Sequence, residues 1–146
     1  MINLELYCDG GVRANGQAGL KIGAIGFTIY DNTKEIFSFA KPIQGMAITN
    51  NEAEYLALLE GLNYCKAAGL RQFKVISDSQ LVVNHVTMRW AAKEERLRVL
   101  RNKVWEIIQE ERWEVLFEWH SRTDKYLQRV DKLCNLAMDS VSDGPR

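Results

Sequence analysis

The order of apolar patterns along this chain restricts its fold more than any other feature. Apolar and polar residues alternate at residues 2–9, which predicts a strand. The later patterns predict strands at 21–31, 35–41, 73–77 and 114–119, and helices at 50–68, 79–88, 93–111 and about 124–140. Three strands in succession, followed by alternating helices and strands, predict an α/β fold with helices on the faces of a mixed sheet.

Glycine and proline mark the expected ends of the first three strands. The triplet Asp9-Gly10-Gly11 is expected to end the first strand, and residues 12–20 are expected to form a turn. Pro42 and Gly45 are expected to end the third strand. These boundaries leave Asp9 at the end of the first strand, as Asp78 is at the end of the fourth.

Length and composition indicate one ordinary globular domain. The chain has 146 residues, of which 47% are hydrophobic and 26% charged. We expect a single domain at residues 1–142 and a frayed tail at 143–146. No apolar run is long enough for a bilayer, and the N-terminus lacks the basic region of a signal peptide. Three cysteines without CxxC spacing predict a reducing, cytoplasmic location.

The balance of charges gives no sign of a polyanionic partner. Lysine and arginine number 19, as do aspartate and glutamate. If the partner is a nucleic acid, local basic patches and bound cations must supply the attraction.

Four acidic residues stand in positions from which they could converge. Asp9 and Asp78 each follow a predicted strand, and adjacent parallel strands would bring their carboxylates together. Glu54 lies one turn into a predicted helix, and Asp131 lies in the last helix. Clustered carboxylates raise one another's pKa values, and Mg²⁺ with its preference for oxygen ligands would relieve this repulsion. Taken singly, each acid could equally be a turn former, a helix cap or a solvated residue.

The sequence around these acids resembles that of a known family. YCDGG, TNNEAEYLALLEGL, SDSQLVV and a late VDKL occur in the order of the type 1 ribonuclease H family, in its minimal form without a basic protrusion. The resemblance implies a five-stranded mixed sheet of three antiparallel meander strands and two parallel strands, with helices on both faces. It implies endonucleolytic cleavage of the RNA strand of RNA/DNA hybrids with two Mg²⁺ or Mn²⁺ ions, giving 5′-phosphate and 3′-hydroxyl products. The metal ligands it implies are Asp9, Glu54, Asp78 and Asp131.

The same resemblance assigns roles to polar residues near the acids. His120 is expected to assist proton transfer or product release, which suits a group that titrates near neutral pH. Amide side chains suit a 2′-hydroxyl, which both donates and accepts hydrogen bonds. The substrate-binding residues that the resemblance implies are Gly10, Gly11, Thr49, Asn50, Asn51 and Gln80. Helix capping is an alternative role for Thr49 and Asn50, and Thr49 with Glu52 has the spacing of a capping box.

The chain departs from the family pattern in two places. Leu127 stands where the family has an asparagine four residues before the last aspartate, so Asp124 remains a rival to Asp131, although it is more naturally a cap. The first loop lacks the usual proline, and Arg13 and Asn15 in it could still contact the hybrid backbone. A catalytically silent hybrid-binding domain of the same fold is the alternative to the nuclease. No protein partner is implied, and we expect a monomer.

Overall fold

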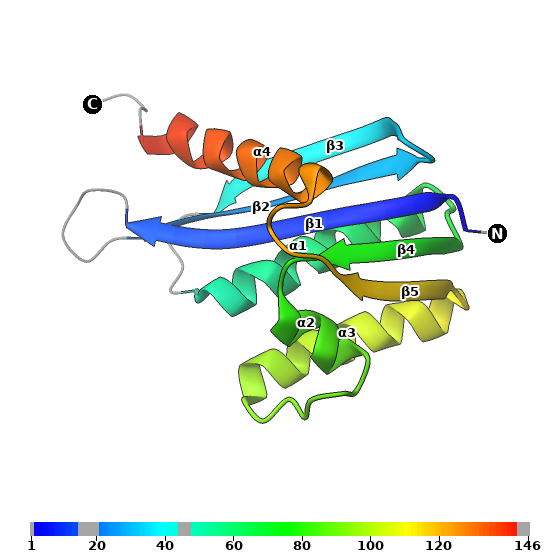
Figure 1. The fold of residues 1–146 in the computed structure, drawn as a ribbon. Helices are drawn as coiled ribbons and strands as arrows, with labels where there is room; N and C mark the ends of the chain where they lie inside the picture. Colours follow the sequence, from blue (N-terminus) through cyan, green and yellow to red (C-terminus); the bar gives the residue numbers. More distant parts are fainter. Residues whose placement is uncertain (1, 15–20, 44–47, 143–146) are drawn as a thin grey trace.

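The computed structural model describes residues 2–14, 21–43 and 48–142, and the backbone alone at Ser142. This part of the chain contains five strands and four helices, in the order βββαβααβα, and Figure 1 shows their arrangement. Their bounds are β1 Leu4–Ala14, β2 Lys21–Asp31, β3 Lys34–Ile43, α1 Asn50–Ala67, β4 Gln72–Ser77, α2 Gln80–Val86, α3 Glu95–Glu111, β5 Glu114–Trp119 and α4 Lys125–Ser142. The expected tail at 143–146 lies outside the described residues.

All five strands form one mixed sheet in the order β3-β2-β1-β4-β5. β1, β2 and β3 form an antiparallel meander, whereas β4 runs parallel to β1 and β5 runs parallel to β4. The parallel partners β1 and β4 are neighbours at the centre of the sheet. The predicted fold class is therefore confirmed. Because β1 and β4 are far apart in the sequence but adjacent and parallel in the sheet, residues near their carboxyl ends lie close together.

Helices cover both faces of the sheet. α1 packs on β1 and β2, with α3 packed against α1, while α4 packs on the other face against β1, β2 and β3. Figure 1 shows α4 in front of the sheet and α1 behind it. Two apolar clusters result, one on each face, and their largest fully buried members include Tyr55, Phe27 and Phe73 on the α1 side and Ile22 and Ile76 on the α4 side.

The predicted end of the first strand was wrong. β1 continues through Asp9-Gly10-Gly11 to Ala14, and its antiparallel pairing with β2 extends as far as Ala14 opposite Lys21. The ladder hydrogen bonds to β2 outweigh the weak strand preference of the two glycines. Asp9 consequently lies inside a strand rather than at its end. Residues 15–20, the rest of the predicted turn and the site of Asn15, lie outside the described part.

Pro42 does not end the third strand as expected. It lies within β3, opposite Ala24 of β2. Because β3 is an edge strand, proline can be accommodated there without loss of a ladder hydrogen bond. Gly45, the other expected terminator, is outside the described residues.

The start of α1 is fixed by its own sequence. The Thr49 hydroxyl accepts a hydrogen bond from the Glu52 backbone N–H at 3.1 Å, and the Glu52 carboxylate accepts one from the Thr49 N–H at 3.1 Å. This is the predicted capping box. No helix in the described ranges is long and apolar enough to cross a membrane.

Candidate metal centre

Three of the predicted acids converge beside the centre of the sheet. The pairing of β1 with β4 ends at Tyr7 opposite Ile76, so Asp9 lies just past the last parallel pair, and Asp78 follows the last residue of β4. Glu54 reaches the same place from the first turns of α1. One carboxylate oxygen from each of Asp9, Glu54 and Asp78 lies within 4.8 Å of the other two.

Gly10 allows α1 to approach β1 this closely. A Cβ atom built on Gly10 would lie 2.2 Å from the Ala53 carbonyl oxygen and 3.0 Å from the Glu54 nitrogen. Any side chain at position 10 would therefore push the helix backbone away from the strand. The backbone N–H of Val12 also donates to Asn50 Oδ1 at 2.8 Å, which ties the first residue of α1 to β1. The position of Glu54 thus follows from backbone contacts between the two elements.

The fourth predicted acid, Asp131, reaches the cluster from α4. It lines the same hollow as Asp9, its charge contributes to the raised pKa of Asp9, and Asn135 Nδ2, one turn later, donates to Asp131 Oδ2 at 3.2 Å. The acids share a hollow of about 370 Å³, which is lined by Asp9, Gly10, Gly11, Val12, Arg13, Asn50, Asn51, Glu54, Asp78, Arg122, Asp131, Cys134, Asn135 and Met138. All four predicted ligands therefore line one hollow.

Burial and mutual repulsion make these acids hard to ionise. Burial, together with the nearby charges of Asp78, Asp131 and Glu54, raises the pKa of Asp9 to about 8. Burial raises the pKa of Glu54 to about 7, although a hydrogen bond with Ser79 opposes the rise. Burial also raises the pKa of Asp78, against the lowering effect of Arg122. A cation at this place would remove the repulsion and keep the acids ionised.

The two oxygens of Asp78 differ in a way that fits a cation site. Asp78 Oδ2 accepts a hydrogen bond from Arg122 Nε at 3.1 Å. Asp78 Oδ1 is buried and has no hydrogen-bond partner among the described residues. A buried carboxylate oxygen without a partner is costly, and a bound cation would satisfy it. Oxygen donors from Asp9, Glu54 and Asp78 within a few ångströms match the preference of hard divalent cations such as Mg²⁺ and Mn²⁺.

Asp124, the rival for the fourth ligand, is engaged elsewhere. Its Oδ1 accepts hydrogen bonds from the backbone N–H groups of Tyr126 and Leu127, at 2.8 Å and 3.2 Å, as the N-cap of α4. Its Oδ2 lies 2.7 Å from His120 Nδ1. Both oxygens of Asp124 thus have partners outside the hollow, so the geometry favours Asp131 as the fourth acid.

His120 is held between two carboxylates. Besides the contact with Asp124, its Nε2 lies 3.0 Å from Glu118 Oε1. Burial lowers the pKa of His120, but the hydrogen bonds to Asp124 and Glu118 outweigh burial, and the net shift is upward. His120 is not among the residues that line the acidic hollow. In this arrangement both ring nitrogens are occupied, and the predicted role in proton transfer stays a prediction.

The predicted substrate-binding residues divide into two groups. Gly10, Gly11, Asn50 and Asn51 line the hollow beside the acids. Thr49 and Gln80 are exposed at the N-termini of α1 and α2 and do not line it. Thr49 also caps α1, so its alternative capping role is confirmed and is compatible with a role in binding. Asn50 does not cap the helix; its Oδ1 accepts the hydrogen bond from the Val12 N–H.

Sequence reasoning missed Arg122 and Asn135 as residues of this site. Arg122 contacts Asp78 from 44 positions away, and Asn135 contacts Asp131. Asn135 could have been found, because it stands four residues after Asp131 on the same helix face. Arg122 stands in a loop without periodic pattern, and its pairing with Asp78 follows from the adjacency of β4 and β5.

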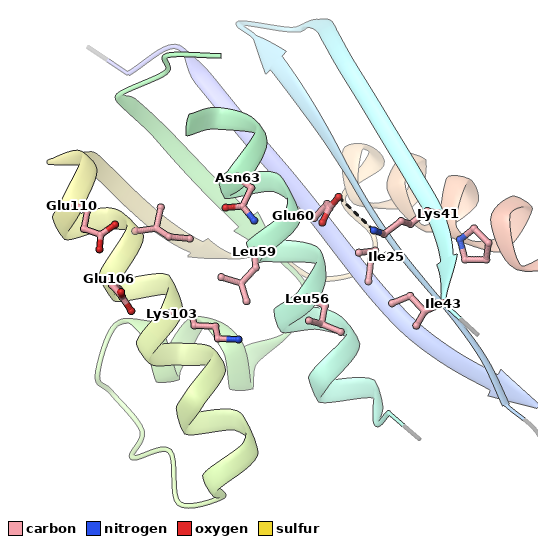
Figure 2. A pocket seen from close by; sticks show the side chains of 12 residues that line it. Ile25, Lys41, Ile43, Leu56, Leu59, Glu60, Asn63, Lys103, Glu106 and Glu110 are labelled. Carbon is pink, nitrogen blue, oxygen red and sulfur yellow. Dashed lines mark ion pairs between the residues drawn. The ribbon is translucent and has the colours of Figure 1, made fainter. Parts of the chain in front are cut away.

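A larger hollow, of about 850 Å³, lies away from the acids between α1, α3 and β3. Leu56, Leu59 and Ile25 are among the apolar residues that line it, and Lys41 of β3 pairs with Glu60 of α1 at 3.7 Å (Figure 2). The four residues of α1 that line it point roughly 140–240° around the helix axis from Glu54, at 3.6 residues per turn; they are Leu56, Leu59, Glu60 and Asn63. This hollow is therefore no part of the carboxylate site.

Comparison with known proteins identifies relatives over nearly the whole chain. The model of the reverse transcriptase-like family matches residues 8–137. The bifunctional protein Rv2228c of Mycobacterium tuberculosis is 34% identical over 142 residues, which are 97% of this chain and 37% of the relative. The chain thus spans well under half of the length of that relative.

Solved structures share the fold. LC11-RNase H1, isolated from compost by a metagenomic approach, has a TM-score of 0.82 and 28% identity, with 97% of this chain and 99% of that chain covered. The N-terminal RNase H domain of Rv2228c, solved as a fusion with maltose-binding protein, has a TM-score of 0.77 and 27% identity, with 97% of both chains covered. LC11-RNase H1 has also been solved in complex with an RNA/DNA hybrid, and that structure has a TM-score of 0.81 and 26% identity over 94% of this chain and 98% of that one. The family match, the shared fold and the converging acids agree: the chain belongs to the reverse transcriptase-like family and has the fold of the type 1 ribonucleases H.

Proposed function

We propose that this protein is an endoribonuclease that cleaves the RNA strand of RNA/DNA hybrids, with 5′-phosphate and 3′-hydroxyl products. The observation that carries the proposal is the convergence of Asp9, Glu54 and Asp78 within 4.8 Å, with the unsatisfied Asp78 Oδ1 among them. The RNA/DNA hybrid bound to the related LC11-RNase H1 supports the choice of substrate. The activity of the longer relatives as whole proteins is outside this proposal, because the chain covers 37% of their length.

The acids would hold two Mg²⁺ or Mn²⁺ ions. When bound, such ions activate a water molecule and stabilise the leaving oxygen of a phosphodiester. Asp9, Glu54, Asp78 and Asp131 supply the carboxylate oxygens. The raised pKa values of Asp9, Glu54 and Asp78 would fall once cations bind, because positive charge favours the ionised form.

The residues around the acids would position the hybrid. Asn51 lines the hollow next to Glu54, where an amide can donate to and accept from a ribose 2′-hydroxyl. The exposed side chains of Thr49 and Gln80 flank it at two helix N-termini, which attract phosphate. We propose that Gly11, beside Asn50, lets the backbone approach the strand that is cut, and that the backbone of Gly10 contributes to the same surface. Buried free cysteines fit the reducing environment of a cytoplasmic protein, and we expect a monomer.

One incubation series tests the proposal. Labelled RNA/DNA hybrid, RNA/RNA duplex and single-stranded RNA are each incubated with the protein in Mg²⁺ or Mn²⁺, with and without EDTA. We expect internal cleavage of the hybrid alone, and none with EDTA. Asp9→Asn should abolish cleavage while hybrid binding persists, and Asp139→Asn, an exposed acid outside the cluster, is the matched control.

The result would also separate the alternatives. Binding of hybrid by the wild-type protein without cleavage in either metal would identify a catalytically silent binding domain. Trimming of single strands from one end would indicate an exonuclease of the same superfamily.

A further inference from the structure

Arg122 places an exposed positive charge on a largely buried acid of the cluster. Its Nε lies 3.1 Å from Asp78 Oδ2. The Arg122 side chain is 88% exposed, whereas that of Asp78 is 11% exposed. The acid is thus fixed inside the hollow, and the cation approaches it from the solvent side.

The backbone that carries Arg122 is held at both ends of its loop. The His120 N–H donates to the Ser77 carbonyl at 3.1 Å, and the Asp124 N–H donates to the Ser121 carbonyl at 3.1 Å. The hydroxyl groups of Ser121 and Thr123 lie 2.6 Å apart. The loop therefore keeps Arg122 beside Asp78, while the exposed side chain can leave the acid without disturbing the fold.

Arg122 is the arginine that contacts a cluster acid. Two arginines line the acidic hollow, Arg13 and Arg122. Arg13 Nη2 pairs with Asp139, and its Nη1 donates to Asn135 Oδ1 at 3.4 Å. Four acids thus share the hollow with one arginine that binds an acid of the cluster and one that binds residues next to it.

The guanidinium and a divalent cation would lie next to each other on one carboxylate. Arg122 donates to Asp78 Oδ2, whereas the buried Asp78 Oδ1 has no hydrogen-bond partner in the described part of the chain. Two like charges a few ångströms apart repel each other strongly in a partly buried site. A cation that binds Asp78 must therefore displace the guanidinium or bind more weakly in its presence.

We propose that Arg122 is the counter-ion of the cation-free site and that it competes with divalent cations for Asp78. It thereby sets the cation concentration at which the site fills. This inference rests on the proposed function, because it assumes that the four acids bind divalent cations. Arg122, which lies in the loop between β5 and α4, would thus be a group of the protein itself that competes with cations for the site.

The dissociation constant for Mn²⁺, measured by electron paramagnetic resonance without substrate, tests the competition. Arg122→Gln should bind Mn²⁺ about two- to fivefold more tightly than the wild type, as expected for loss of a competing ion pair with an exposed partner. Arg122→Lys retains the charge and should stay near the wild type. Arg13→Gln removes one positive charge from the same hollow without freeing a cluster oxygen, and should change the constant less than twofold. The difference between Arg122→Gln and the wild type should shrink in 0.5 M salt, because salt screens exposed charges.

A second readout uses the unmodified protein. The Nε–H signal of Arg122 in a nitrogen–proton NMR spectrum should shift on addition of Mg²⁺, with the midpoint of cation binding. Equal Mn²⁺ affinity of Arg122→Gln and the wild type, or an Nε–H signal unmoved at saturating Mg²⁺, would overturn the inference. If the wild type still bound cations and cut hybrid in that case, the proposed function would stand. Failure of the wild type to bind either cation would overturn both.

Discussion

Replacing Glu54 by glutamine should stabilise the cation-free protein at alkaline pH. Burial raises the pKa of Glu54 from its ordinary 4.5 to about 7. The folded state therefore binds more protons than the unfolded chain between these pH values, and stability falls as the pH rises through that range. Above pH 7 the loss amounts to about 3 kcal/mol, at 1.36 kcal/mol per pH unit. Glutamine has nearly the same shape, can still accept the hydrogen bond of Ser79, and carries no charge.

We expect the Glu54→Gln variant to melt roughly 5–10 °C above the wild type at pH 8 in EDTA, from 2–4 °C per kcal/mol for a domain of this size. The difference should nearly vanish at pH 4.5, where Glu54 is protonated in the folded state and half protonated in the unfolded chain. Saturating Mg²⁺ should reduce or reverse it, because the wild type gains about 1.4 kcal/mol at a tenfold excess over the dissociation constant, and the variant has lost a ligand.

Thermal unfolding monitored by circular dichroism at pH 4.5, 6, 7 and 8, with EDTA or Mg²⁺, measures these differences. Glu60→Gln is the matched control, because Glu60 stands on the same helix in a partly exposed pair with Lys41. That variant should change stability by less than about 1 kcal/mol, with little dependence on pH. A Glu54→Gln variant that is less stable than the wild type at pH 8 in EDTA, with Glu60→Gln unchanged, would refute the reasoning.

Three further outcomes follow from the geometry. Gly10→Ala should lose roughly 1–3 kcal/mol or more of stability in chemical denaturation, because its Cβ would meet the Ala53 backbone at 2.2 Å. Gly11→Ala is the control and should be close to neutral, because its Cβ would lie 3.6 Å from its nearest neighbour. Equal losses in the two variants would contradict this reasoning. In an NMR titration the two histidines should titrate on opposite sides of pH 6.5, His120 above it through its carboxylate partners and His85 below it through burial; a reversed order would disprove the assigned contacts. The stability that His120 contributes should be fully present below pH 6.5 and lost as the pH rises through its folded pKa. The melting temperatures of His120→Ala and the wild type should therefore converge at high pH. A difference in melting temperature that grows with pH would contradict this.

The sequence predicted the sheet and its helices because each element carries its own periodic pattern. The apolar spacing of residues 50–68 and the capping box at Thr49 are local signals, and the structure has α1 at Asn50–Ala67. The meander and the two parallel strands follow from the order of these elements. Asp78 was expected after a strand, and it follows Ser77, the last residue of β4.

Local signals failed where a distant partner decides the outcome. Two successive glycines after Asp9 favour a turn when taken alone, but the pairing with β2 continues the strand and the approach of α1 explains Gly10. Pro42 favours a strand end because proline has no backbone N–H for the ladder. On the edge strand β3 that N–H is not needed by a second neighbour, so the strand can continue through Pro42. The contact of Arg122 with Asp78 spans 44 residues, so it could be found only once the neighbours of β4 were known.

The geometry of the acid cluster is set by contacts that do not involve the acids themselves. The hydrogen bond from Val12 to Asn50 and the close contact of Gly10 with Ala53 fix α1 against β1. These contacts hold Glu54 close to Asp9 and Asp78 although the carboxylates repel one another, and this repulsion adds to burial in raising the pKa values of Asp9 and Glu54. A cluster held only by its cation would separate when the cation leaves. Because these backbone contacts do not involve a cation, cation binding would relieve the carboxylate repulsion without having to order the chain.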